Sequence, residues 1–290
     1  MATLKAIRRR ISSVKSTQQI TRAMKLVAAA RLRRAQEALV AARPYHEALQ
    51  RVASSMLFGE QAAVAAAEDA PPAALMLVIA SDRGLCGGYN ANLARKAEEE
   101  ARRMRGAGLE TDFFAVGRKT ADHFKRARVT LAGESVNNVP RLATFALARR
   151  LAAGMLADFR AGKIREAGMV YSQFRSALSQ HPVYERLLPV PVPESAESGT
   201  PAVATQYLIE PSRGELMPVV LRRYVEAAIF HALLEGEASE HGARMTAMDS
   251  ATNNASEMIE NLTLEMNRAR QATITRELMD IVGGAEALRG

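Results

Sequence analysis

The fold is decided by the stretch MTAMDSATNNASEMIENLTLEMNRA, residues 245–269. Apolar and small side chains recur along it in alternating steps of three and four, at Met245, Met248, Thr252, Ala255, Ile259, Leu262, Met266 and Ala269. This spacing is typical of the seam of a two-stranded coiled coil. No proline follows Pro218, so the pattern predicts one long helix over residues 216–288. Such a helix would be on the order of 100 Å long, too long to bury its seam inside its own globule, and it needs a partner helix.

Residues 1–57 supply the partner. The same three-four alternation runs through Ile7, Ile11, Val14, Gln18, Thr21, Lys25, Ala28, Leu32, Ala35, Leu39 and Ala42. Charge favours the pairing, because residues 1–43 carry a net +10 and residues 215–290 a net −5. A chain whose ends pair around a compact middle must return on itself, so the sequence predicts an antiparallel coiled coil of residues 1–57 and 216–288. The alternative, two ordinary solvated helix faces, stays open at this point.

An α/β domain is predicted between the two helices, over residues 74–210. Ala74 to Ala80 is a short and almost wholly apolar run, which is typical of a strand covered on both faces. Further strands are expected at 112–116, 129–132, 169–174 and 206–209, and helices at 91–104, 119–126 and 141–160. A proline-punctuated stretch, 182–193, and a polar loop, 194–200, precede the last of these strands, and no strand is assigned to them. The predicted fold class is therefore α+β, a long antiparallel coiled coil with an inserted Rossmann-like α/β domain.

Residue types that carry chemistry are sparse. Cys86 is the single cysteine, which excludes an intramolecular disulfide and a cysteine zinc site. The five histidines are scattered without the spacing of metal ligands. No apolar run reaches the length of a membrane-spanning helix. We therefore expect a mechanical or interaction protein with no catalytic residue, no cofactor and no metal.

A glycine-rich turn, SDRGLCGGYN at residues 81–90, joins the first predicted strand to a helix. Such turns often bind phosphate through backbone N–H groups, but this spacing matches neither G-x-G-x-x-G nor G-x-x-x-x-G-K-[ST]. Two other function classes remain open. A nucleotide-dependent α/β enzyme would bind phosphate with the turn from Gly84 to Gly88. A basic coiled-coil protein that binds nucleic acid or acts as a scaffold would use the positive N-terminal helix, since the whole chain carries +8.

Three segments resemble the gamma subunit of F-type ATP synthase in its bacterial form. They are ITRAMKLVA at 20–28, SDRGLCGGYN at 81–90 and NRARQATITRELMDIVGGA at 267–285. The resemblance implies a central-stalk rotor that is not an enzyme by itself. It couples rotation of the membrane c ring to conformational cycling of the catalytic beta subunits. Its implied partners are the alpha and beta subunits, the epsilon subunit and the c ring, with neither nucleic acid nor direct nucleotide binding. The implied location is peripheral, on the cytoplasmic side of the bacterial inner membrane.

The resemblance also implies roles for particular residues. Contacts with the lever and the catch of beta fall on Met24, Lys25, Arg83, Cys86, Arg244, Arg270, Gln271, Thr275 and Glu277. An apolar bearing tip comprises Ile274, Leu278, Ile281 and Val282, and a foot that faces the c ring and epsilon includes Tyr207 and Glu210. The plant-chloroplast form carries a regulatory cysteine pair, and this chain has Cys86 alone, so we expect no thiol switch.

Overall fold

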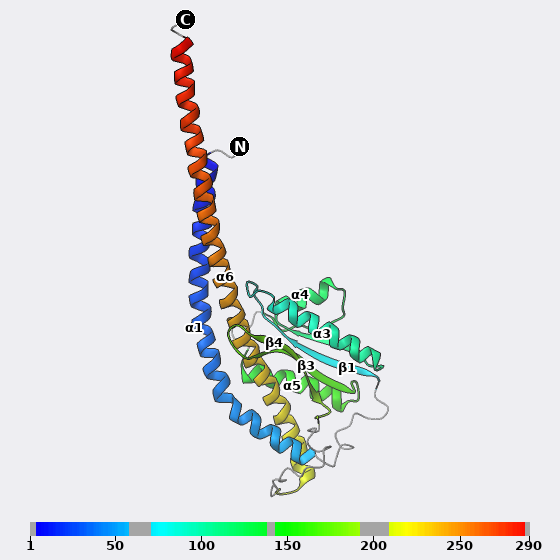
Figure 1. Ribbon diagram of the computed structural model, residues 1–290. Coiled ribbons are helices and arrows are strands. Elements are labelled where there is room, and N and C mark those ends of the chain that lie inside the picture. The colour runs from blue at the N-terminus through cyan, green and yellow to red at the C-terminus, as the bar shows by residue number, and fades with distance from the viewer. Residues whose placement is uncertain (1–3, 58–70, 138–142, 192–208, 288–290) are drawn as a thin grey trace, which may run out of the picture. The chain divides into compact units, whose positions relative to one another are not determined.

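Two long helices dominate the computed structural model, which describes residues 4–57, 71–137, 143–191 and 209–287 (Figure 1). Helix α1 spans Leu4–Leu57 and helix α6 spans Arg213–Ala287. Helix α6 begins three residues before the predicted start because Ser212 caps it: the Glu215 backbone N–H donates to Ser212 Oγ at 3.4 Å. Among the described residues, no helix is long and apolar enough to cross a membrane.

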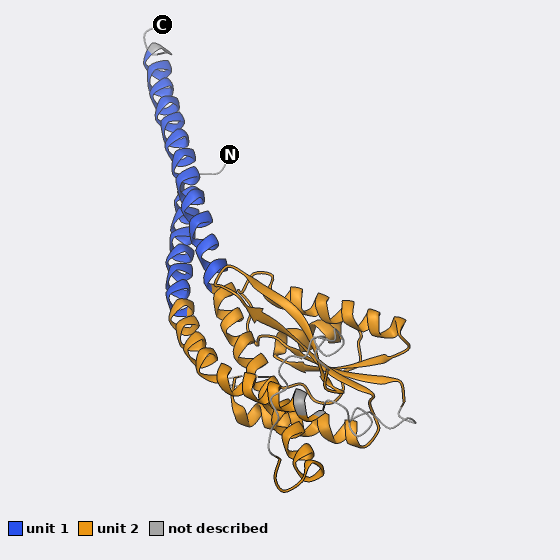
Figure 2. Cartoon of the chain, turned by 60° about the horizontal axis from the view of Figure 1, so that its bottom comes forward, with its two compact units in different colours: residues 1–27, 245–290 blue, residues 28–244 orange. Residues whose placement is uncertain are grey.

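The chain forms two compact units, shown in different colours in Figure 2. Unit 1 contains residues 1–27 and 245–290, and unit 2 contains residues 28–244. Both long helices contribute to each unit. The domain limits 1–57, 74–210 and 216–288 remain a prediction.

Helices α1 and α6 are antiparallel in unit 1. Three pairs of side chains show it: Gln18 with Ser256 at 2.7 Å, Thr21 with Thr252 at 2.8 Å, and Lys25 with Asp249 at 2.6 Å. The partner's number falls as the number along α1 rises. All three α1 residues lie on the predicted seam, so the antiparallel pairing of the terminal helices is confirmed.

Unit 2 contains a four-stranded mixed sheet. Its strands are β1 (Ala73–Ile79), β2 (Glu110–Val116), β3 (Glu166–Phe174) and β4 (Gln180–Leu188), and their order is β2-β1-β3-β4. Strands β2 and β3 each pair with β1 in parallel, whereas β4 pairs with β3 in antiparallel fashion. The inserted domain is thus a parallel α/β unit extended by one antiparallel strand.

Helices cover both faces of this sheet (Figure 1). Leu75, Leu77 and Ile79 of β1 join a core formed with α5 (Phe145–Arg160) and the start of α6. Met76 and Val78 join a second core formed with α3 (Tyr89–Gly106) and α4 (Arg118–Arg126). Strand β1 is therefore buried on both faces, as its apolar sequence predicts.

Two strand predictions differ from the structure. Residues 129–132 form no regular strand and make one isolated bridge, Leu131 to Phe113. The proline-punctuated stretch, to which no strand was assigned, contains most of β4, in which Pro182 lies opposite Ser172. Proline cannot donate to a ladder but is tolerated where its nitrogen faces away from the neighbouring strand, and β4 is an edge strand of the described sheet. The strand predicted at 206–209 lies almost wholly outside the described residues.

Candidate functional site

The 81–90 loop leaves the end of β1 and leads into α3. Its own polar side chains close it: Ser81 presents its backbone N–H and its hydroxyl to Asn90 Oδ1, at 3.1 and 2.9 Å. The Asn90 amide in turn donates to Cys86 Sγ at 3.2 Å. The start of α4 secures the same loop, because the Arg118 backbone N–H donates to Asp82 Oδ1 at 2.9 Å. That contact satisfies one of the N–H groups that a helix start leaves without a helical partner.

The loop turns one side chain inward and presents others to solvent. Cys86 is only 1% exposed, whereas Leu85 is 63% exposed and Arg83 is also exposed. The backbone explains the alternation, since Leu85 and Gly87, on either side of Cys86, have φ of 63° and 57°. A leucine in this left-handed region is uncommon and persists only where surrounding contacts hold it. Burial raises the pKa of the Cys86 thiol, so the group is protonated at neutral pH and is a poor nucleophile.

Hydrogen bonds join helix α6 to the end of the loop and to the adjoining sheet. The Tyr89 hydroxyl donates to the Gly236 carbonyl at 3.0 Å, and burial keeps the pKa of Tyr89 well above its usual value, so the donor is permanent. Ser239 Oγ donates to the Ser172 carbonyl at 2.9 Å, and the Phe174 backbone N–H donates to Glu235 at 2.5 Å. These contacts fix α6 to β3 and to the start of α3.

Arg244 of α6 holds the loop near its tip. One guanidinium nitrogen pairs with Glu240 Oε1 at 2.6 Å, and another donates to the Gly84 carbonyl at 3.2 Å. The Arg244 and Glu240 side chains are 11% and 14% exposed. Burial raises the pKa of Glu240 although Arg244 lowers it, and burial followed by the Arg244 charge lowers the pKa of His241 to about 4. Arg244 is therefore a buried cation engaged inside unit 2.

A family model described as ATP synthase matches residues 3–288. A protein named ATP synthase gamma chain from Pelotomaculum thermopropionicum is 45% identical over 290 residues, which cover 99% of this chain and all of the relative. This chain belongs to the ATP synthase gamma-chain family. A gamma chain from Moorella thermoacetica is also 45% identical over 293 residues, with both chains fully covered.

Solved structures agree with this assignment. The central stalk and c ring of the Tetrahymena thermophila mitochondrial ATP synthase contain a chain that matches with a TM-score of 0.62 and 26% identity, covering 80% of this chain and 99% of that one. A chain of the Euglena gracilis mitochondrial ATP synthase matches with a TM-score of 0.71 at 20% identity, covering 98% of this chain and 94% of that one, which shows the shared fold.

The gamma chain is the non-catalytic rotor subunit of F-type ATP synthase, as predicted. It is a peripheral part of that membrane-associated complex. The comparisons do not support the alternative of a basic coiled-coil protein that binds nucleic acid or acts as a scaffold.

The contact residues predicted for this gamma chain lie in both units. In unit 1, Met24 and Lys25 are half-buried on α1, and Lys25 pairs with Asp249. The α6 residues of the predicted catch are all exposed: Arg270, Gln271, Thr275 and Glu277. The bearing tip is exposed as well, at 48% for Ile274, 57% for Leu278, 67% for Ile281 and 61% for Val282. In unit 2, Arg83 is exposed, whereas Cys86 and Arg244 are buried.

The predicted foot is described only in part. Glu210 is exposed and directly precedes Pro211 and Ser212, which lead into α6. Tyr207 lies outside the described residues.

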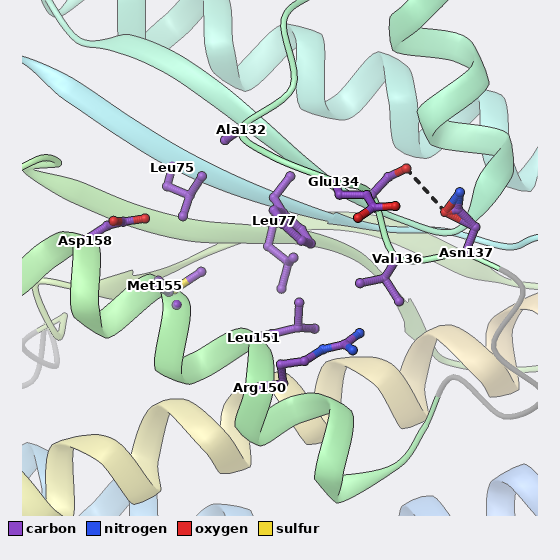
Figure 3. A pocket seen from close by; sticks show the side chains of 13 residues that line it. Leu75, Leu77, Ala132, Glu134, Val136, Asn137, Arg150, Leu151, Met155 and Asp158 are labelled. Atoms are coloured by element: carbon purple, nitrogen blue, oxygen red, sulfur yellow. Dashed lines mark hydrogen bonds between the residues drawn. The ribbon is translucent and has the colours of Figure 1, made fainter.

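Unit 2 also contains a cleft of about 630 Å³ between α5 and the sheet (Figure 3). Leu77 and Leu151 contribute apolar walls, while Arg150, Glu134 and Asp158 contribute charged groups around them. Asp158 is already paired with Lys163 at 3.0 Å. Among the described residues, no cluster of three or more histidine, cysteine or acidic side chains could hold a metal ion.

The sequence did not predict which residues hold the 81–90 loop in place, namely Ser81, Tyr89, Asn90, Gly236 and Glu240. One of them left a readable signal, since Glu240 and Arg244 are four residues apart, the spacing of an ion pair on one helix face. Ser81 and Asn90 bond each other within the loop, whereas Tyr89 and Gly236 come together from distant parts of the chain. The hydroxyl of Tyr89 meets a carbonyl 147 residues away.

Proposed function

We propose that this gamma chain transmits torque through three exposed surfaces. The first is the face of the 81–90 loop with Arg83, which contacts an acidic lever of a beta subunit. The second is the α6 segment with Arg270 and Gln271, which acts as a catch on beta. The third is the apolar bearing tip of α6, which turns in a collar of the alpha and beta subunits.

The other predicted contact residues are assigned to these surfaces or to the foot. Met24 and Lys25 of α1 also contact beta, and Thr275 and Glu277 extend the catch. Tyr207 and Glu210 form the foot toward the c ring and epsilon. The complex that contains this chain works on the cytoplasmic side of the bacterial inner membrane. Cys86 and Arg244 belong to the loop site, where both side chains are buried.

The exposed apolar end of α6 is the observation that carries this proposal. Its four tip residues are each about half exposed or more. A row of apolar side chains on a helix end is costly in water unless another surface receives it. Such a surface suits a rotating part, because apolar contacts are not directional, whereas each hydrogen bond would have to break on every turn at about 0.5–1.5 kcal/mol net.

The internal contacts of unit 2 support a mechanical role. Torque applied to the sheet must reach α6 without loss, and the hydrogen bonds to Glu235, Gly236 and Ser239 tie the two together. A rotor works on beta by making different contacts with its different conformational states, because only differential contact can shift their populations.

Charge reversal at Arg83 tests the lever contact. We expect Arg83→Glu to lower ATP-driven proton pumping several-fold in a reconstituted complex, because it replaces attraction to an acidic surface with repulsion. Arg95→Glu is the matched control, since Arg95 is exposed on α3 and bonds Asn92 of its own helix. Equal pumping by the Arg83→Glu complex and the parent would exclude the contact.

A further inference from the structure

Arg244 of α6 contacts the backbone of the 81–90 loop. Its guanidinium donates to the Gly84 carbonyl at 3.2 Å while Glu240 holds the other side of the same group at 2.6 Å. A third neighbour is His241, whose Nδ1 lies 3.4 Å from the Arg244 nitrogen that pairs with Glu240. Because arginine only donates hydrogen bonds, Nδ1 is the acceptor, which requires that nitrogen to carry no proton. Because the pKa of His241 is lowered to about 4, the ring is neutral at pH 7 and carries one proton, which this contact places on Nε2.

The loop needs such support because its backbone is strained at the tip. Leu85 has a φ of 63°, and a non-glycine residue in this region costs on the order of 1–2 kcal/mol. The contacts of Ser81, Asn90 and Tyr89 hold the two ends of the loop, whereas the Arg244 contact lies next to Leu85. The Cys86 side chain is held as well by the Asn90 amide, which donates to Sγ at 3.2 Å, so losing the Arg244 contact would loosen the Gly84–Leu85 peptide and leave the two ends of the loop attached.

We propose that Arg244 is a positioning residue that clamps the 81–90 loop onto α6. The clamp keeps Cys86 inside and holds Arg83 and Leu85 outward as the face that the loop offers to a partner. Arg244 and Cys86 therefore influence the partner contact through the shape of the loop and not by touching the partner. The clamp itself concerns unit 2 alone, whereas its effect on activity rests on the proposed function.

The single thiol reports on the clamp in the isolated protein. Cys86 is 1% exposed, so a thiol reagent can react only when the loop opens. We expect Arg244→Gln to raise the labelling rate of the purified full-length chain at least about tenfold, because hydrogen bonds of charged groups contribute about 1.5–3 kcal/mol. Glu240→Gln, which releases the guanidinium from its ion pair, should raise the rate to a smaller extent.

Arg223→Gln is the matched control. Arg223 lies on the same helix and pairs with Glu226 at 2.9 Å, away from the loop. Its substitution also removes an ion pair from α6, so a general loss of stability would show in both variants. Urea unfolding of each variant measures that loss. An unchanged labelling rate in Arg244→Gln, or an equal rise in Arg223→Gln, would overturn the clamp.

A double-mutant cycle on the assembled complex tests the second half of the inference. If Arg244 acts through the loop, Arg244→Gln lowers proton pumping in the parent but has little further effect in an Arg83→Ala, Leu85→Gly background, where the presented face is already lost. Additive losses would show that Arg244 touches the partner directly. Fast thiol labelling with no loss of pumping in any variant would leave the clamp standing and overturn the lever contact, so the two failures are distinguishable.

Discussion

Thr21 of α1 and Thr252 of α6 place their hydroxyl oxygens 2.8 Å apart across the antiparallel helix pair of unit 1. The neighbouring pairs, Gln18 with Ser256 and Lys25 with Asp249, are also polar. Directional contacts at a seam fix the register of two helices but add less stability than apolar packing does. The seam positions of α1 in unit 2 differ, because Leu32 and Leu39 are 6% and 3% exposed.

The two kinds of seam should respond differently to alanine. We expect Leu39→Ala to lower the free energy of unfolding of unit 2 by about 2–5 kcal/mol, because it leaves a cavity in a packed site. Lys25→Ala should cost less than about 1 kcal/mol, since its ion pair with Asp249 is partly exposed to solvent, and high salt should erase the difference from the parent. Urea unfolding followed by circular dichroism measures both. A larger loss for Lys25→Ala than for Leu39→Ala would contradict this picture.

Gly117 is a position at which only glycine fits. Its φ is 101°, and a Cβ added there would lie 2.4 Å from the Ala80 carbonyl oxygen, at the point where β1 leads into the 81–90 loop. We expect Gly117→Ala to lower the free energy of unfolding by at least about 1–3 kcal/mol. Gly154→Ala is the control, because nothing lies within 4 Å of an added Cβ in the middle of α5, and alanine there should stabilise by up to about 1 kcal/mol. Similar urea midpoints for both variants would refute the argument.

Two histidines, half-buried His46 and buried His241, should make unit 2 sensitive to mild acid. His46 of α1 stacks on His231 of α6 with ring centroids 4.3 Å apart. Burial, then the charge of His231, lowers the pKa of His46 from 6.5 to about 4, against the opposing charge of Glu235. The pKa of His241 is also lowered to about 4. Between pH 6.5 and pH 4 these two histidines therefore bind more protons in the unfolded chain than in the folded chain, and their contribution to stability falls as the pH falls through this window.

The slope should reach at most about 1.4 kcal/mol per pH unit for each histidine. Burial raises the pKa of Glu185 and Glu240, which favours the folded state as the pH falls and so opposes part of the loss. Comparison with His46→Gln isolates one contribution, because glutamine does not titrate. Urea unfolding at several values between pH 4.5 and 7.5 should show a shallower slope for this variant. An identical slope for the variant and the parent would exclude a role for His46.

The main elements were readable because their signals are periodic and local. The three-four alternation around Thr252 predicts a helix with a partner, and the apolar run from Ala74 to Ala80 predicts a strand with two covered faces. Strand β4 was not readable, since Pro182 is a signal against a strand, and its tolerance depends on an edge position that only the assembled sheet defines.

The site was less predictable than the fold for a related reason. Arg83, Leu85 and Cys86 are neighbours in one loop, yet the first two are exposed and the third is buried. The left-handed conformation of Leu85 decides this, and leucine gives no sign of it in a sequence. Arg244 likewise donates to the carbonyl of Gly84, which lies 160 residues away in the sequence, so neighbouring residues do not reveal this contact.

Shortening α6 beyond the bearing tip and altering the catch should have different effects. Beyond about Ala269 the three-four seam lapses, and the apolar residues from Ile274 to Val282 are exposed. Deleting residues 283–290 keeps that apolar segment and should leave assembly and coupled ATP synthesis largely intact. Arg270→Ala combined with Gln271→Ala removes two exposed polar groups while keeping the helix, since alanine is a strong helix former. We expect this variant to lower turnover more than assembly, because a catch acts only while it holds one rotational state.

Rotor incorporation and proton-driven ATP synthesis in inverted vesicles separate these outcomes. Incorporation reports assembly, and the rate per incorporated rotor reports turnover. Arg268→Ala with Ala272→Gly is a useful control, because it changes neighbouring positions of the same helix while Arg270 and Gln271 remain. A general weakening of the helix would lower turnover in this control too, and glycine makes it the harsher test of the backbone. If the deletion abolishes synthesis while the double alanine variant performs like the parent, the division of α6 into a bearing and a catch is wrong.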